Sequence, residues 1–211
     1  MIYYFEEIEK FKEEEFKYFY KFLPKFRKDK IEKLKFFKDK KLSLLGYILF
    51  LYGLRVEKRD FSTPIFSYLK YNKPYIKNVF FNISHCKSGV VCIISNNNVG
   101  IDIENIDKNH LSLLDTVMNK NEEKIILNSK IKENTFTRLW TIKESYLKNI
   151  GTGLIDDLKL LDFSNFKKDE YIFDDKFFRI YKNKKNYICS CSVDSMELIN
   201  VNLFDLKKII N

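Results

Sequence analysis

Two pairs of charged residues stand at spacings that would bring their side chains together. In the apolar run NVGIDIENID, residues 98–107, Asp102 and Glu104 are two residues apart, and a strand turns such residues to the same face. Glu144 and Lys148 are four residues apart in a helical pattern, so they share one face of a helix. The simplest explanations are a solvent-facing strand and an exposed ion pair. The functional explanation is a cation between the carboxylates, since Mg²⁺ prefers a few carboxylates together with water and substrate phosphate.

A serine and a histidine, Ser84 and His85, follow a short apolar strand pattern in FNISHCKSG, residues 81–89. The chain has only two histidines, so a histidine-rich metal centre is excluded. A Ser-His-Asp triad on a nucleophile elbow would show the motif G-x-S-x-G, which the sequence lacks. We therefore set the hydrolase interpretation aside.

Composition indicates a globular protein. The 211 residues are 45% hydrophobic, which is enough for one domain or two small lobes with a core. No apolar run reaches the roughly 18 residues of a membrane span, and the N-terminus is acidic where a signal peptide would be basic. The four cysteines form no C-x-x-C pair and show no metal-ligand spacing. We expect a cytoplasmic protein with reduced cysteines.

The charge is unevenly distributed along the chain. The net charge of +9 comes from 38 Lys and Arg against 29 Asp and Glu, and residues 21–41 alone hold ten basic and three acidic residues. Such a segment attracts phosphates or acidic protein surfaces. A solvated helix face is the simpler interpretation of the same pattern.

Hydrophobic periodicity predicts a mixture of helices and strands. Residues 89–95 and 99–104 predict two strands joined by a hairpin turn, and residues 160–205 predict antiparallel strands. Each half of the chain combines a charged helix, a longer helix that ends near glycine, and β structure. We expect the α+β class, with lobes at 1–98 and 99–211 and a site in the cleft between them. Helices are expected over 5–22, 26–37, 39–52, 111–118, 120–130 and 135–149.

Four segments together resemble the signature of the 4′-phosphopantetheinyl transferases: KPY, FNISH, VGIDIE and WTIKESYLK. The last two match the patterns G-[IV]-D-[IV]-E and W-x-x-K-E-x-x-x-K, which are specific when they occur together. The resemblance covers about residues 20–160 and is closer to the larger, pseudo-dimeric type that activates peptide and polyketide synthases. It implies two similar lobes related by pseudo-twofold symmetry. It also implies transfer of 4′-phosphopantetheine from coenzyme A to a serine hydroxyl of an apo acyl or peptidyl carrier protein, with release of 3′,5′-ADP.

The resemblance implies a role for four acidic residues. Asp102, Glu104 and Glu144 match the ligands of Mg²⁺, with Mn²⁺ as an alternative, and the metal would bridge to the pyrophosphate of coenzyme A. Glu122 falls at the spacing of a fourth, catalytic acidic position. Glu144, Glu122 or a water on the metal would accept the serine proton, and these alternatives stay open. Lys148 matches a catalytic lysine that contacts the phosphate.

Coenzyme A would be bound as co-substrate by basic and hydroxyl side chains from both halves. The resemblance places Lys73 near the adenine, and Ser84 and His85 at the 3′-phosphate and adenosine. Arg27 and Lys30 would also reach the 3′-phosphate. The full set of implied coenzyme A contacts is Arg27, Lys30, Ser43, Lys73, Ser84, His85, Lys143 and Lys148.

Two other functions fit parts of the sequence. A nucleic-acid-binding protein or Mg²⁺-dependent nuclease would suit the net charge and the acidic pair, but Glu104 is followed by NID without the expected lysine two residues on. A non-catalytic carrier-binding protein of the same fold would not need the acidic positions. We therefore expect a monomeric enzyme that acts on carrier proteins and has neither nucleic acid nor membrane partners.

Overall fold

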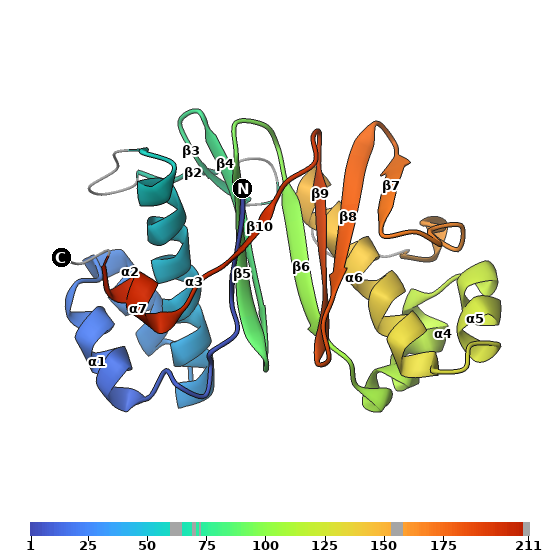
Figure 1. The fold of residues 1–211 in the computed structure, drawn as a ribbon, viewed down its shortest axis with the longest axis horizontal. Coiled ribbons are helices and arrows are strands. Elements are labelled where there is room, and N and C mark those ends of the chain that lie inside the picture. Colours follow the sequence, from blue (N-terminus) through green and yellow to red (C-terminus); the bar gives the residue numbers. More distant parts are fainter. Residues whose placement is uncertain (60–64, 69–70, 72, 153–157, 209–211) are drawn as a thin grey trace.

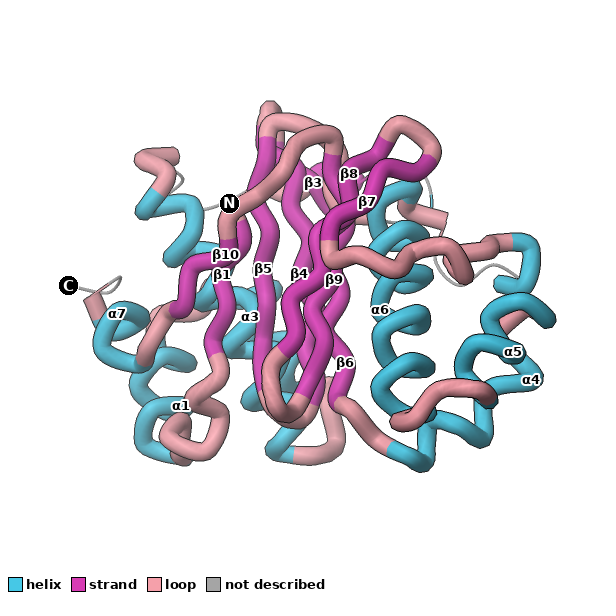
Figure 2. Tube along the Cα trace, turned by 45° about the vertical axis from the view of Figure 1, so that its right-hand side comes forward, coloured by secondary structure: helices cyan, strands magenta, loops and turns pink. Residues whose placement is uncertain are grey.

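The computed structural model describes residues 1–59, 65–68, 71, 73–152 and 158–208. Two β-sheets lie next to each other at the centre of the molecule, and helices cover the outer side of each sheet (Figure 1). Figure 2 shows the strands of both sheets gathered in the middle, with α3 and α6 on opposite sides. The fold is a helix–sheet–sheet–helix arrangement, which confirms the expected α+β class.

The first sheet has six strands in the order β10-β1-β5-β4-β3-β2. Its strands are β1 (Ile2–Phe5), β2 (Ser67–Tyr68), β3 (Pro74–Ile76), β4 (Val79–Cys86), β5 (Gly89–Ser95) and β10 (Leu198–Asn200). The helices on its side of the molecule are α1 (Glu13–Lys21), α2 (Lys25–Glu32), α3 (Phe37–Val56) and α7 (Leu203–Lys207).

The second sheet has four strands in the order β6-β9-β8-β7. Its strands are β6 (Gly100–Asn105), β7 (Glu170–Phe173), β8 (Lys176–Lys182) and β9 (Asn186–Ser192). The helices on its side are α4 (Leu114–Val117), α5 (Lys120–Leu127) and α6 (Lys132–Ile150), with short 3₁₀ segments η2 (Lys108–Leu113) and η3 (Leu158–Leu160).

Strand β5 is buried along its whole length because it has apolar neighbours on both faces. Val90 and Cys92 belong to the core beneath α3. Val91 and Ile93 belong to a separate cluster between the two sheets, where they meet Ile101 of β6. This double burial explains why the sequence of β5 is a continuous apolar run rather than an alternating one.

The two halves of the chain follow the same order of elements. In the first half β1 precedes α1, α2 and α3, and the sheet then adds β3, β4 and β5 so that β5 pairs with β1. In the second half β6 precedes α4, α5 and α6, and β7, β8 and β9 follow so that β9 pairs with β6. All of these pairings are antiparallel, so β6-β9-β8-β7 repeats β1-β5-β4-β3.

Several boundaries differ from the expectation: the helix expected over 26–37 ends at Glu32, and the one expected over 39–52 runs from Phe37 to Val56. The differences at the two ends of the chain change the fold. The helix expected over 5–22 is wrong in its first part, because Ile2–Phe5 form a fully buried strand and α1 begins only at Glu13. A short apolar run of this kind has no periodicity to separate strand from helix. At the other end, β10 pairs in parallel with β1 and α7 packs near α3. The chain therefore returns at residues 198–207 to the six-stranded sheet and its helices.

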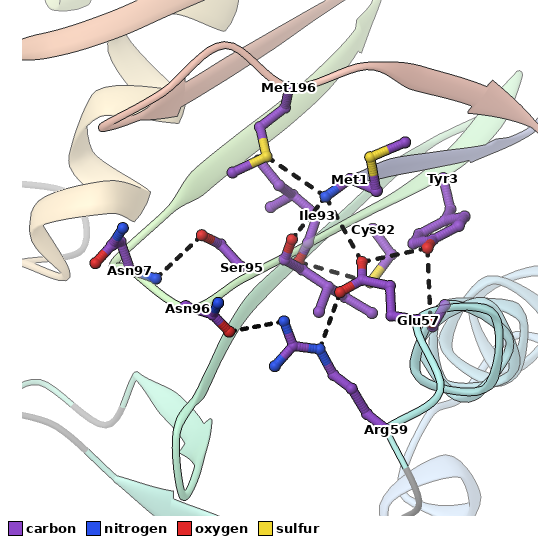
Figure 3. A network of polar contacts seen from close by, with 12 residues as sticks. Met1, Tyr3, Glu57, Arg59, Cys92, Ile93, Ser95, Asn96, Asn97 and Met196 are labelled. Carbon is purple, nitrogen blue, oxygen red and sulfur yellow. Dashed lines mark hydrogen bonds and ion pairs between the residues drawn. The ribbon is translucent and has the colours of Figure 1, made fainter.

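A polar network ties the end of α3 to the turn that follows β5 (Figure 3). Glu57 accepts hydrogen bonds from the hydroxyl of Tyr3 at 3.2 Å and from Nε of Arg59 at 2.9 Å. Arg59 also donates to Oδ1 of Asn96 at 2.8 Å, and the amino group of Met1 lies 3.6 Å from Glu57. These contacts hold the turn between β5 and β6, through which the chain passes from the first sheet to the second.

None of the helices in the described ranges combines the length and the apolar character that crossing a bilayer requires.

Candidate active site

Three segments that are distant in sequence meet where the two sheets adjoin. Asp102 of β6 is almost completely buried, and its Oδ1 lies 2.5 Å from Nζ of Lys148 on α6. Ser84 of β4 donates to the same oxygen at 2.8 Å and accepts from Lys148 at 3.0 Å. Glu144, one turn before Lys148, has Oε2 at 3.9 Å from the same ammonium. The structure thus brings together four of the residues that the sequence singled out.

The carboxylates of this cluster outnumber their cation. Burial and the charge of Asp102 raise the pKa of Glu104 to about 7, and the same two causes raise the pKa of Glu144. Burial works against the charge of Lys148, but the neighbouring acids, Asp102 foremost, outweigh it and raise the pKa of its ammonium. Oδ2 of Asp102 is buried without a hydrogen-bond partner. One ammonium therefore neutralises part of the charge of three carboxylates, and one carboxylate oxygen has no hydrogen bond.

Trp140 is a site residue to which the sequence argument gave no role. Its side chain hydrogen-bonds to Glu104, which favours the charged form of that carboxylate. Trp140 precedes Glu144 by one helical turn, so both face β6 from α6. The spacing W-x-x-x-E was the available signal, because residues four apart on a helix share a face.

The acidic cluster has the donor chemistry of a hard-cation site but holds a lysine. The unpartnered Oδ2 of Asp102, with Glu104 and Glu144 nearby, supplies the oxygen ligands that Mg²⁺ accepts. Within the described residues, however, no group of three or more His, Cys, Asp or Glu side chains is arranged to hold a metal ion. The residue types fit such an ion, whereas the ammonium of Lys148 is the cation that the acids contact here.

Glu122 and Lys143 form a second, separate ion pair. Their side chains are completely buried with 2.7 Å between Oε2 and Nζ. Glu122 also accepts from the backbone N–H of Phe163 at 3.0 Å, and Lys143 donates to the carbonyls of Leu158 at 2.9 Å and Leu161 at 2.8 Å. Neither side chain faces solvent, and all of these contacts lie within the protein, so the pair holds the fold together in this structure. The catalytic role expected of Glu122 and the coenzyme A contact expected of Lys143 stay predictions.

A cavity of about 430 Å³ lies between α2, α3 and β4. Arg27 lines it, with Nη2 donating to the carbonyl of Ser43 at 2.9 Å and to its hydroxyl at 3.3 Å, and with the guanidinium 4.8 Å from the ring centre of Tyr47. Nε of Arg27 is buried without a partner. Burial lowers the pKa of Arg27 and of Lys30, because a charge is costly away from water. Four of the residues that line the cavity were expected from the sequence to contact coenzyme A: Arg27, Lys30, Ser43 and His85.

Strand β4 separates the cavity from the acidic cluster. Ile83 and His85 line the cavity, whereas Ser84, between them, bonds to Asp102. This alternation is the ordinary period of a strand. His85 is exposed overall, yet surrounding protein lowers the pKa of its ring, with the charge of Lys148 adding to the effect. The two groups of residues therefore lie on opposite faces of one strand.

Lys73 lies in neither group. It is buried at the start of β3, and its Nζ donates to Oδ1 of Asn98 at 2.6 Å and to the carbonyls of Val99 at 2.7 Å and Asn149 at 2.9 Å. Burial lowers its pKa to about 8. All three contacts lie within the protein, and the contact with adenine expected from the resemblance stays a prediction.

Comparisons with known proteins find relatives in one family. The profile of the 4′-phosphopantetheinyl transferase superfamily matches residues 98–192. The transferase gsp of Aneurinibacillus migulanus is 33% identical over 186 residues, which cover 81% of this chain and 76% of the relative. The transferase Sfp of Bacillus subtilis is 32% identical over 148 residues, 67% of this chain and 66% of the relative. The L-aminoadipate-semialdehyde dehydrogenase-phosphopantetheinyl transferase of Candida glabrata is 32% identical over 142 residues, 61% of this chain and 55% of the relative.

Proposed function

The chain belongs to the 4′-phosphopantetheinyl transferase superfamily, and on that premise we propose that it transfers the 4′-phosphopantetheine group of coenzyme A to a serine hydroxyl of an apo acyl or peptidyl carrier protein. It is an enzyme of this transferase class. One observation carries the proposal: a cavity that holds two cations, Arg27 and Lys30, against one carboxylate, Asp39, and a buried acidic cluster occupy the two faces of β4.

The cavity suits the 3′-phosphate end of coenzyme A. Arg27 and Lys30 bring two cations to its wall, Ser43 and His85 bring further hydrogen-bonding groups, and Nε of Arg27 still lacks an acceptor. A guanidinium with free N–H groups is the side chain best matched to a phosphate. The guanidinium also makes a cation–π contact with the ring of Tyr47.

The acidic cluster suits the pyrophosphate end. Asp102, Glu104 and Glu144 would hold Mg²⁺, with Mn²⁺ as the alternative, and a divalent ion bound there would offset the charge of the pyrophosphate and of the leaving group. Lys148 would add a second positive charge at the same place, once its ammonium contacts the pyrophosphate as well as Asp102.

The reaction is a phosphoryl-type transfer that demands positioning and charge neutralisation from the protein. The serine oxygen of the carrier forms a bond to the β-phosphorus of coenzyme A, and the bond from that phosphorus to the bridging oxygen breaks, which releases 3′,5′-ADP. The serine proton passes to a base. We assign this role to Glu144 or to a water that it orients, because the Glu144 side chain lies at the cluster.

We also propose that the two halves of the chain are lobes related by a pseudo-twofold axis, with the active site in the cleft between them. The repeated strand order and the position of Asp102, Ser84 and Lys148 at the junction of the sheets support this organisation. The proposed working form is a monomer in the cytoplasm. Its proposed partner is an acidic carrier protein, which the basic segment 21–41 would attract.

The direct test is the mass of an apo carrier protein after incubation with the enzyme, coenzyme A and Mg²⁺. We expect the carrier to gain one phosphopantetheine on its serine, and chelation of divalent ions to stop the reaction. A panel of apo carriers from fatty-acid, peptide and polyketide synthesis would identify the partner. Absence of any mass gain across the panel would refute the proposed activity.

A further inference from the structure

The C-terminal end of α6 is bound to the first lobe by a cluster of amide and ammonium groups. The backbone carbonyl of Asn149 accepts from Nζ of Lys73 at 2.9 Å and from Nδ2 of Asn98 at 2.5 Å. In return, Nδ2 of Asn149 donates to the carbonyl of Asn98 at 3.1 Å and to that of Cys191 at 2.9 Å. The last turn of α6 is thereby joined to the turn before β6, to β9 and to the start of β3.

All three hydrogens of the Lys73 ammonium are committed within this cluster. They are directed to Asn98, Val99 and Asn149, and a lysine ammonium has three donors and no acceptor. A positive charge also interacts favourably with the carbonyl end of a helix. Lys73 is therefore fully occupied in binding the end of α6 and has no hydrogen left to offer a ligand.

Helix α6 and β6 touch at backbone level beside this cluster. A Cβ added to Gly100 would collide with the backbone of Ser145 and of Asn149, so only glycine allows this approach. Ser145 follows Glu144 in the chain, and Asn149 follows Lys148. The contact points that fix α6 against β6 are thus immediate neighbours of the two proposed active-site residues on α6.

We propose that Lys73 is a positioning residue of the transfer reaction, which holds the end of α6 and thereby places Lys148 against Asp102. The inference rests on the proposed function, because its readout is transfer. It differs from the role that the resemblance implies for Lys73, which is direct contact with the adenine of coenzyme A. The positioning role predicts a lower kcat, whereas direct contact with adenine predicts a weaker affinity for coenzyme A.

The test compares Lys73→Met with Lys77→Met, a matched change of an exposed lysine in the following turn. If Lys73 is a positioning residue, Lys73→Met lowers kcat by about tenfold to a hundredfold, because a small misplacement of a catalytic group is costly. The dissociation constant for coenzyme A, measured by calorimetry, stays near that of the wild type. Lys77→Met changes neither quantity.

A double-mutant comparison asks whether Lys73 acts through Lys148. In a Lys148→Met background the added change Lys73→Met should cost little, because the group to be positioned is already gone. An equal loss in both backgrounds would overturn the inference and assign Lys73 a general structural role. A weaker affinity for coenzyme A with unchanged kcat would overturn it in favour of direct contact.

Asn98→Ala provides a second variant if Lys73→Met does not fold. It removes one acceptor of Lys73 and one donor to Asn149, and it should lower kcat in the same manner but less. An Asn98→Ala protein with wild-type kcat would contradict the inference. A wild-type protein that modifies no apo carrier would refute the proposed function, whereas an active wild type with an unaffected Lys73→Met variant would refute the positioning role alone.

Discussion

Helix α6 carries two lysines that each pair with a carboxylate, and the two pairs differ in almost every other respect. Lys143 and Glu122 are completely buried, 2.7 Å apart, and their remaining hydrogen-bonding capacity is used by backbone groups. Lys148 is 29% exposed and pairs with Asp102, which keeps a buried oxygen without a partner. Glu144 adds another carboxylate at 3.9 Å from the same ammonium.

The difference separates an ion pair that holds the fold from one that is prepared for a ligand. A buried pair with all partners in place offers nothing to a substrate, and removing one member leaves an uncompensated charge. A cluster with excess carboxylate and an unsatisfied oxygen has an energetic reason to bind a cation. Both lysines belong to the same short motif, so sequence alone does not distinguish them.

The largest effect on the transfer rate is expected when Asp102 is substituted. Asp102→Asn removes the charge that Lys148 contacts and one proposed metal ligand while keeping the size of the side chain. We expect the transfer rate to fall by about a thousandfold, the upper range for loss of a preorganised electrostatic group. The melting temperature should change little. A rate assay with an apo carrier, paired with thermal unfolding, would contradict this account if the variant kept full activity.

The opposite outcome is expected for Glu122. Glu122→Gln leaves the Lys143 ammonium buried without a counter-charge, so the free energy of unfolding should fall by about 3 kcal/mol. The transfer rate per folded molecule should stay at the wild-type level. Urea unfolding and a rate corrected for the folded fraction measure the two quantities. A stable but inactive variant would return Glu122 to the catalytic residues.

The sequence predicted several of the elements and residues involved, but not the difference in burial between the two ion pairs of α6. Strand β5 matched residues 89–95 because a bounded apolar run is a strong signal, and α6 extended the expected 135–149 by a few residues. The meeting of Asp102 with Glu144 and Lys148 was implied by the resemblance of their two motifs to a known family, because spacing within one element says nothing about a second one. Burial is different: the Glu122–Lys143 pair is enclosed by groups from farther along the chain, the carbonyl of Leu158 in η3 and the N–H of Phe163.

The same limit applies to the N-terminal strand and to Lys73. Ile2–Phe5 is a strand only because β5 and β10 flank it, and β10 comes from the other end of the chain. Lys73 matches a motif position, yet its three acceptors belong to segments 98–99 and 149, which its own neighbours do not reveal. Long-range partners decide such cases, and a local pattern does not contain them.

A smaller effect is expected at the cavity on the other face of β4. Arg27→Met should weaken coenzyme A binding by about tenfold, the cost of one hydrogen bond to a charged group. Binding of dephospho-coenzyme A, which lacks the 3′-phosphate, should be unaffected by the change. Calorimetry with both ligands tests this assignment. Equal losses for the two ligands would place the 3′-phosphate elsewhere.

The smallest expected effect is on stability and concerns Lys73, a buried lysine whose three hydrogen bonds go to amide oxygens of Asn98, Val99 and Asn149. Burial lowers its pKa from 10.5 to about 8, so above pH 8 the unfolded chain holds a proton that the folded chain has lost. Stability of the wild type relative to Lys73→Met should therefore rise from about pH 8 toward pH 10, by at most about 1.4 kcal/mol per pH unit. Parallel pH profiles from urea unfolding would contradict the shift.

The comparison between the two ion pairs is tested most directly by substituting the two lysines of α6 in the same way. Lys148→Met and Lys143→Met are assayed side by side for transfer of phosphopantetheine to an apo carrier, with each rate divided by the folded fraction. We predict that Lys148→Met loses most of the rate while Lys143→Met, although less stable, keeps it. Loss of activity per folded molecule in Lys143→Met, with Lys148→Met unimpaired, would contradict the account at its centre.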